Sequence, residues 1–206
     1  MGGRTAIIDY GVGNLFSLRS SLLAVGGDAV VTRDPGEIRD AARLILPGVG
    51  AFGDAARKLR ETGMFALVQE EAERGKPLLG ICLGMQLLFD RSFEYGEHAG
   101  LGLIPGEVRP IADVIPAGLD IPHMGWNSLH FENPCAIFRD LREGEYVYFV
   151  HSYAAFDCAP ALAATAEYGG VPLTAAVSRG RVFGTQFHPE KSGPVGLRIL
   201  RAFAEL

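Results

Sequence analysis

A short buried strand that runs into a Gly-x-Cys-x-Gly turn constrains the fold of this chain more than any other feature. Leu78 to Ile81 form an apolar run entered through a proline, which is typical of a parallel strand covered on both faces. Cys82 follows between Gly80 and Gly84, and Met85 to Phe89 continue at helical spacing. A side chain at either glycine would collide with the neighbouring strand or helix. The pattern predicts a nucleophile elbow, with cysteine in the place of serine.

The predicted turn gives the thiol of Cys82 a chemical advantage. The thiol lies at a helix N-terminus, where partial positive charge favours the thiolate, and the free N–H of Leu83 can hold an oxyanion. The alternative is a buried structural cysteine, which is the commonest situation of a free thiol. Position alone leaves both interpretations open, and the residues downstream decide between them.

Strands and helices alternate in the first half of the chain. Strands predicted at residues 5–9, 28–32, 43–46 and 78–81 are separated by helical segments, and this rhythm indicates a parallel sheet with helices on both faces. Short candidate strands follow from residue 106 to residue 187, before a closing helix at 195–206. The sequence therefore predicts an α/β protein of three layers. Its central sheet is mostly parallel and flanked by helices, and an antiparallel β section lies in the C-terminal half. We interpret residues 1–206 as a single domain.

Composition and charge exclude several function classes. The 206 residues are 48% hydrophobic and 21% charged, with a formal net charge of −5, which gives no reason to expect a nucleic acid partner. No apolar run is long enough to cross a bilayer, and a strand that starts at Thr5 leaves no room for a signal peptide. Cys82, Cys135 and Cys158 are too few and too irregularly spaced for a disulfide framework. We expect a cytoplasmic protein that holds no metal or cofactor.

A histidine and a glutamate close the last predicted strand. In extended chain His188 and Glu190 face the same side, and the carboxyl ends of parallel strands are where ligands bind. A thiol nucleophile needs a base, and the base needs an acceptor on its other ring nitrogen. Cys82, His188 and Glu190 supply these three roles, although an isolated His-x-Glu is more often a solvated surface pair. His151 is a rival base, but it lacks a carboxylate at the next-but-one position.

A glycine-rich loop follows the third predicted strand. Gly48, Gly50 and Gly53 have the spacing of a dinucleotide-binding fingerprint. We reject that interpretation because the loop does not follow the first strand, and because Asp54 at the start of the helix would repel a pyrophosphate. The better interpretation is a loop beside Cys82 whose backbone N–H groups complete an oxyanion hole.

The only tryptophan lies in a segment without periodicity. Trp126 is part of Pro122-His123-Met124-Gly125-Trp126-Asn127, which we interpret as a loop rich in Pro, Gly and Asn. A single tryptophan is more often in the core, but this setting makes a contact surface an equal alternative.

These motifs together resemble those of the class I, or triad, glutamine amidotransferases. The resemblance rests on the elbow with Gln86, on the loop from Pro47 to Gly50, and on His188-Pro189-Glu190. Further segments are similar to the branch of that family that forms the glutaminase subunits of imidazole glycerol phosphate synthases in histidine biosynthesis. These segments are Asp9 to Asn14, Pro122 to Asn127 and His188 to Ser192.

The resemblance implies a flavodoxin-like fold and glutaminase activity. Cys82 is implied to attack the side-chain amide of glutamine, His188 to protonate the leaving ammonia and then activate water, and Glu190 to orient His188. The implied oxyanion hole is the N–H of Leu83 with one from Gly48, Val49 or Gly50. The implied substrate contacts are Gln86, Glu94 and the backbone of His151, Ser152 and Tyr153. Ala154 stands where other members carry different, often larger residues.

The resemblance also implies a partner, a (β/α)8 cyclase subunit that forms a heterodimer with this chain and receives the ammonia. Chemistry supports a partner independently, because ammonia released into water is protonated and lost as a nucleophile. The alternatives are a glutaminase subunit of a pyridoxal phosphate, anthranilate or GMP synthase, a non-catalytic regulatory module on the same scaffold, and a hydrolase of esters or peptides. The expected docking residues are Asn14, His123, Met124, Trp126, Asn127 and Lys191.

Overall fold

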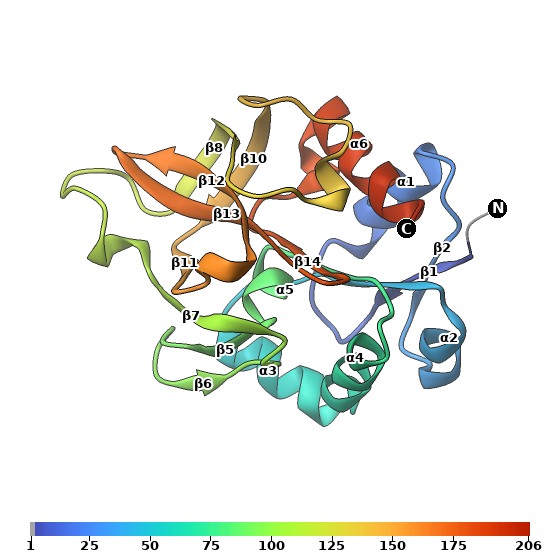
Figure 1. Cartoon of the computed structure of the whole chain (residues 1–206). Coiled ribbons are helices and arrows are strands. Elements are labelled where there is room, and N and C mark those ends of the chain that lie inside the picture. The colour runs from blue at the N-terminus through green and yellow to red at the C-terminus, as the bar shows by residue number, and fades with distance from the viewer. Residues whose placement is uncertain (1–2) are drawn as a thin grey trace.

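A central eight-stranded sheet organises the molecule (Figure 1). The computed structural model describes residues 3–206, so the first two residues of the predicted domain lie outside it. The strand order is β2-β1-β3-β4-β14-β13-β12-β9, and neighbours run parallel from β2 to β14 and antiparallel from β14 to β9. The strands are β1 (Thr5–Ile8), β2 (Ala29–Thr32), β3 (Arg43–Leu46), β4 (Leu78–Ile81), β9 (His130–Phe131), β12 (Leu162–Tyr168), β13 (Val171–Arg179) and β14 (Val182–Thr185).

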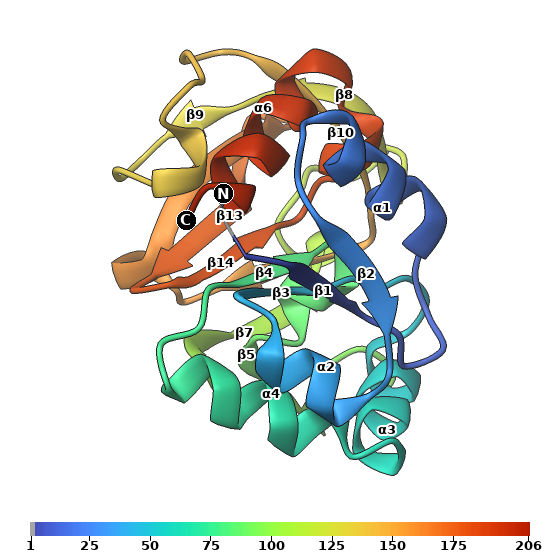
Figure 2. The same ribbon diagram turned by 90° about the vertical axis from the view of Figure 1, so that its right-hand side faces the viewer.

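Helices cover both faces of the parallel part of this sheet. All residues of β1, β3, β4 and β14 are buried, as expected for apolar runs packed on both sides. Figure 2 shows that these helices form two groups, one on each face of the sheet. One group is α1 (Leu15–Ala24) and α6 (Gly193–Ala204), and the other is α2 (Pro35–Asp40), α3 (Phe52–Glu61) and α4 (Met64–Glu73). The predicted three-layer α/β architecture is confirmed.

Two smaller sheets build the rest of the molecule. One pairs β8 (His123–Ser128) with β10 (Tyr146–His151), and the other has the order β11-β7-β5-β6. This second sheet comprises β5 (Phe89–Ser92), β6 (His98–Ala99), β7 (Ile104–Pro110) and β11 (Tyr153–Phe156). Short 3₁₀ helices complete the connections: η1 (Ile111–Asp113), η2 (Ala136–Phe138), η3 (Ala159–Ala161) and η4 (Pro189–Lys191). The prediction of antiparallel structure in the C-terminal half is confirmed.

Three local predictions are wrong. The helix after Cys82, α5 (Leu83–Gln86), is shorter than predicted, because β5 already begins at Phe89. The segment around Trp126 is strand β8 rather than a loop. Helix α3 begins at Phe52 instead of at Asp54, and its N-cap residue, Ala51, makes no side-chain hydrogen bond to the first turn. The carboxylate of Glu94 accepts the N–H of Phe52 at 2.7 Å.

The sheet brings three separate segments to one edge. Ile81 pairs with Thr185, and Leu46 pairs with Gly80, so β3, β4 and β14 end side by side. The residues that follow these strands are the loop 47–50, Cys82 and the segment 186–190. The site described below is therefore assembled at the carboxyl edge of the parallel strands, where open α/β sheets bind their ligands.

Candidate active site

The backbone at Cys82 is strained. Its φ of 54° and ψ of −114° lie in a region that residues with a side chain rarely adopt. The two flanking glycines make the turn possible. A Cβ on Gly84 would lie 1.8 Å from the carbonyl oxygen of Leu46, and a Cβ on Gly80 would lie 2.6 Å from the oxygen of Gly84. The steric reason for the Gly-x-Cys-x-Gly pattern is therefore visible in the structure.

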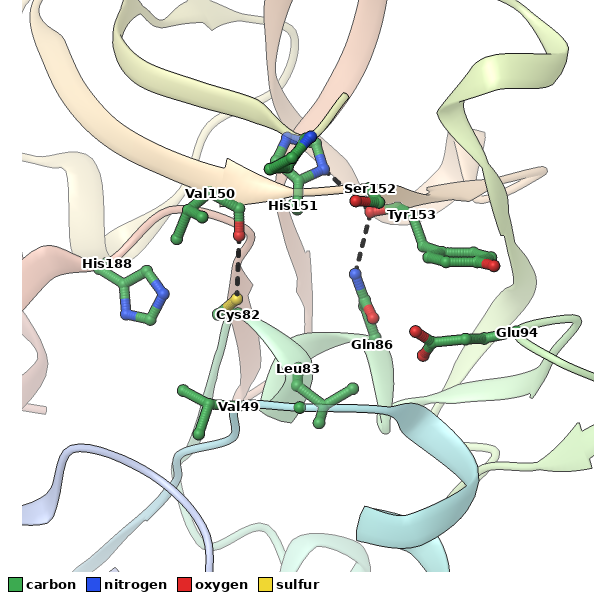
Figure 3. A pocket seen from close by; sticks show the side chains of 12 residues that line it. Val49, Cys82, Leu83, Gln86, Glu94, Val150, His151, Ser152, Tyr153 and His188 are labelled. Carbon is green, nitrogen blue, oxygen red and sulfur yellow. Dashed lines mark hydrogen bonds between the residues drawn. The ribbon is translucent and has the colours of Figure 1, made fainter. Parts of the chain in front are cut away.

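The sulfur of Cys82 borders a cavity of about 310 Å³. Figure 3 shows its surroundings, with the imidazole of His188 on one side and the carbonyl of Val150 on another. Cys82 as a residue is 8% exposed, and its Sγ lies 4.0 Å from the oxygen of Val150. The cavity is lined by Val49, Gly50, Cys82, Leu83, Gln86, Glu94, Pro122, Val150, His151, Ser152, Tyr153 and His188.

His188 and Glu190 form a buried hydrogen-bonded pair. Their side chains are each 4% exposed, and Nδ1 of His188 lies 2.8 Å from Oε1 of Glu190. The backbone between them is the 3₁₀ turn η4 instead of the extended strand that the sequence analysis assumed. The contact therefore forms through a tight turn, and the prediction that an extended chain carries both side chains is wrong.

The pKa of His188 is raised to about 9. Burial by itself lowers this pKa, but the hydrogen bonds and negative charges of Cys82 and Glu190 outweigh it. An imidazolium is therefore favoured at neutral pH beside the sulfur, which is the arrangement that a thiolate–imidazolium pair requires.

The glycine loop lies against the first turn of α5. A Cβ on Gly48 would be 2.7 Å from the backbone nitrogen of Gly84, and Val49 and Gly50 line the cavity beside Leu83. Sequence analysis missed one residue here, Tyr10, whose buried hydroxyl donates to the carbonyl of Pro47 at 2.8 Å. Burial first, and then the charge of Cys82, raise the pKa of Tyr10, so it stays a hydrogen-bond donor.

Gln86 and Glu94 both reach the cavity with part of their polar groups already engaged. Nε2 of Gln86 donates to the carbonyl of Tyr153 at 3.0 Å and to Oε1 of Gln186 at 2.9 Å. Only the amide oxygen of Gln86 is left for a ligand. Glu94 spends Oε2 on the N–H of Phe52, and burial raises its pKa.

His151 is excluded as a base by its contacts. Nδ1 donates to the carbonyl of Tyr153 at 2.9 Å, and Nε2 lies 3.0 Å from Nδ1 of His123. Burial lowers the pKa of His151 to about 3, with a further lowering from His123 and His188. The ring is therefore neutral, and both of its nitrogens are occupied.

One expected docking residue is placed inside the protein. His123 is 4% exposed and stacks on Phe149 and Tyr168, with ring centroids 4.9 Å and 4.3 Å apart. It cannot be a surface contact, which corrects the expectation from the sequence. Asn127 uses its amide on Nε2 of His123, at 3.3 Å, and on the carbonyl of Glu167, at 2.7 Å.

Four of the expected docking residues lie at the surface, whereas Asn127 is half-buried. Met124 and Trp126 are 65% and 55% exposed, and they project from the outer face of β8. Trp126 packs edge-on against Tyr148 of β10, and Nζ of Lys191 lies 5.8 Å from the centre of the Tyr148 ring. Trp126 is therefore a surface residue instead of a core one. Asn14 and Lys191 are exposed too.

Residues 3–206 hold neither a cluster of metal-binding side chains nor a membrane-spanning helix. No group of three or more His, Cys, Asp or Glu side chains in this part of the chain could hold a metal ion. None of its helices combines the length and apolarity needed to cross a membrane.

Comparison with known proteins identifies the family. The family model of class I glutamine amidotransferases matches residues 6–205. The chain therefore belongs to the class I glutamine amidotransferase family, and the resemblance seen in the sequence is confirmed. The chain is similar to proteins named imidazole glycerol phosphate synthase subunit HisH. The protein of that name from Moorella thermoacetica is 51% identical over 202 residues, which span 98% of this chain and 94% of the relative. The one from Wolinella succinogenes is 47% identical over 201 residues, or 97% and 98% of the two chains.

Solved structures support the same fold. A crystal structure of a glutamine amidotransferase superposes with a TM-score of 0.74 at 20% identity, covering 98% of this chain and 99% of the other. The structure of PurLQS from Thermotoga maritima superposes with a TM-score of 0.76 at 23% identity, covering 100% and 99%. At these identities the likeness concerns the fold alone.

Proposed function

We propose that this chain is the glutaminase subunit of an imidazole glycerol phosphate synthase, and that it hydrolyses glutamine to glutamate and ammonia. The observation that carries the proposal is the position of Cys82. Its thiol is held at a strained turn beside an imidazole that is bonded to Glu190, in a chain about half identical to synthase subunits along nearly its entire length.

The first half of the proposed reaction forms a thioester. The proton of Cys82 passes to Nε2 of His188, and the sulfur attacks the amide carbon of the glutamine side chain. Charge develops on the amide oxygen, and the N–H of Leu83 with one from the loop 48–50 receives it. The tetrahedral intermediate collapses as His188 donates its proton to the departing ammonia.

The second half regenerates the enzyme. His188, now neutral, takes a proton from water, and the resulting hydroxide attacks the thioester carbon. The carbon–sulfur bond breaks, glutamate leaves, and the thiolate faces the imidazolium again. Glu190 keeps Nδ1 protonated throughout, so that Nε2 is the nitrogen that exchanges protons.

The ends of glutamine require polar partners on the other side of the cavity. The oxygen of Gln86 and the carboxylate of Glu94 suit the α-ammonium group, because both are acceptors. The backbone from His151 to Tyr153 lines the remaining wall. We assign these residues to substrate binding.

A (β/α)8 cyclase is the proposed partner and ammonia acceptor. The outer face of β8 and β10 is a suitable docking surface, because exposed aromatic and methionine side chains are enriched at interfaces. Trp126, Met124 and Lys191 belong to this surface, and Val150 on the same strand pair borders the cavity. Asn14 extends the proposed surface onto α1. We place this heterodimer in the cytoplasm, where reactive thiols stay reduced.

A glutamate assay tests the proposal. The purified chain is incubated with glutamine alone, with the cyclase, and with the cyclase and its nucleotide ligand. We expect slow release of glutamate from the isolated chain and a clear increase with partner and ligand. No release under any of the three conditions would reject the glutaminase assignment, whereas full activity without the partner would reject the coupling.

A further inference from the structure

Gln186 is a buried amide that lies against the proposed nucleophile. It directly follows β14 and has 0% of its surface exposed. Its backbone N–H donates to the carbonyl of Ala175 at 2.8 Å, which fixes the main chain. The side chain has two contacts: Oε1 lies 2.9 Å from Nε2 of Gln86, and Nε2 lies 3.8 Å from Sγ of Cys82. The proposed mechanism has not used this residue.

The orientation of this amide follows from its neighbours. The oxygen and nitrogen of an amide look alike, so their placement must be argued from partners. Gln86 points its NH₂ at the carbonyl of Tyr153, which can only accept. The second hydrogen of that NH₂ then needs an acceptor, and only the oxygen of Gln186 provides one. The NH₂ of Gln186 must therefore face the sulfur.

The same carbonyl joins this pair to β8. The carbonyl of Tyr153 also accepts from Nδ1 of His151, and Nε2 of His151 lies beside Nδ1 of His123. Burial lowers the pKa of both histidines, so each is neutral, with one donor nitrogen and one acceptor. Asn127, on the same strand as Trp126, closes the series at Nε2 of His123. These bonds fix the acceptor that Gln86 needs.

We propose that Gln186 stabilises the thiolate of Cys82 by donating a hydrogen bond to its sulfur. The carbonyl of Val150 lies 4.0 Å from the sulfur on another side. That carbonyl can accept from the neutral thiol but repels the thiolate. Once the proton has passed to His188, the amide of Gln186 joins the imidazolium in compensating for this repulsion. Hydrogen bonds to charged groups are about twice as strong as those between neutral groups.

The inference rests on the proposed function only in taking Cys82 as the nucleophile. It is tested on the full chain by alkylation with iodoacetamide as a function of pH. The thiolate sulfur forms a bond to carbon and iodide leaves, so the rate follows the thiolate fraction. Mass spectrometry of the peptide that contains Cys82 separates this reaction from those of Cys135 and Cys158, whose pKa values burial raises.

Gln186→Met keeps the length of the side chain and removes both the donor to the sulfur and the acceptor of the Gln86 amide. We expect the midpoint of the alkylation profile to move upward by about one pH unit, because one charged hydrogen bond is lost. Gln69→Met is the control away from the sulfur, since Gln69 on α4 likewise loses an amide hydrogen bond, to the carbonyl of Leu101 at 2.7 Å. Both variants retain the titratable groups around the sulfur, which are Tyr10, Glu94, His151, Tyr153, His188 and Glu190.

A second measurement needs no variant at Gln186. The side-chain ¹⁵N–¹H resonances of Gln186 in the wild-type chain are expected to shift with the same midpoint as the alkylation profile, whereas those of Gln69 stay constant. An unchanged alkylation midpoint in a folded Gln186→Met chain overturns the proposal. A side-chain resonance of Gln186 that stays constant across the pH range overturns it as well. Neither readout requires glutamine turnover, so an inactive chain with a shifted midpoint would reject the glutaminase function and keep this inference.

Discussion

Two buried histidines border the same cavity, yet at neutral pH one is positively charged and the other is neutral. His188 and His151 each present Nδ1 to an oxygen at nearly the same distance, 2.8 Å and 2.9 Å. Burial lowers the pKa of both. The oxygen beside His188 belongs to a carboxylate, and a thiol lies next to its ring, so its pKa rises to about 9. The oxygen beside His151 is a neutral carbonyl, whose hydrogen bond raises the pKa too little to offset burial, and two neighbouring histidines lower it further, so the pKa of His151 falls to about 3. Both rings are buried, so the difference between their pKa values comes from their partners: a carboxylate and a thiol offset burial at His188, and nothing of that charge does so at His151.

The largest effect is expected when the thiol beside His188 is removed. Cys82→Ala removes the nucleophile and one of the groups that raise the pKa of His188. Glutamine-dependent synthesis by the complex should fall by at least about 10⁴-fold, as for other nucleophile deletions, while synthesis from added ammonia persists. NMR titration of the ring should show a lower pKa for His188. Cys158→Ala, at another buried cysteine, serves as the control with activity retained. Loss of ammonia-dependent synthesis as well would indicate misassembly rather than a catalytic role.

Glu190→Gln makes the surroundings of His188 more like those of His151. The neutral amide removes the negative charge, so the pKa of His188 should fall and kcat should decrease by about 10²- to 10⁴-fold. The pH profile of kcat/KM and NMR titration of the ring measure both effects. A raised histidine pKa adds stability that is complete below pH 6.5 and is lost as the pH rises through about 9. The variant should therefore lose less stability across that window. An unchanged pKa would show that Cys82 alone controls His188.

His151→Gln tests the other member of the pair through stability. Its pKa lies near 3 in the folded chain against 6.5 in the unfolded chain. Its neutral state therefore stabilises the fold above pH 6.5, and that stability is lost as the pH falls. Between pH 6.5 and about 4 the loss amounts to roughly 3 kcal/mol. The variant should show a flatter acid limb in denaturant unfolding, whatever its stability at neutral pH. His130→Gln, at an exposed histidine, should leave the limb unchanged, and an equally steep limb in both variants would contradict the assignment.

The smallest effect is expected at the docking surface, where a substitution should change partner affinity without changing the pKa values of His151 and His188. Trp126→Ala should weaken association with the cyclase by about 30-fold, which is typical of an exposed tryptophan at the centre of an interface. Calorimetric titration measures this change. Phe93→Ala, at an exposed ring that directly follows β5, should leave the affinity unchanged. Because His123 and Trp126 lie on opposite faces of β8, the pKa values of both buried histidines should persist. An unfolded Trp126→Ala chain would return that residue to a structural role.

The comparison also explains which parts of the molecule can be predicted from sequence. The elbow was predictable because β4 is a continuous apolar run and the glycines around Cys82 have a steric reason that holds wherever this turn occurs. The partners of Cys82 followed from chemistry, since a thiol needs a base and a base needs an acceptor. Their local conformation did not follow, because a 3₁₀ turn leaves no periodic signal over three residues.

The failures have physical reasons. In strand β8 the polar residues His123 and Asn127 point inward, whereas the apolar residues Met124 and Trp126 point outward. The polarity of the side chains therefore predicts the wrong buried face for this strand. The run from Met85 to Phe89 is almost entirely apolar, and periodicity cannot then distinguish a helix from a strand. Tyr10 contacts Pro47, and Gln186 contacts Cys82 and Gln86, each across a long separation in sequence. No spacing along the chain reports such contacts.

Gly84 has a consequence for anyone who alters this protein. The backbone of Leu46 and Pro47 rests directly on its α-carbon, with no room for even one methyl group. Direct backbone contact at Gly84 therefore sets the distance between the turn that carries Cys82 and the loop that faces it. A single added carbon at this position would force the loop and the nucleophile apart and lower the activity, although every reactive side chain would still be present.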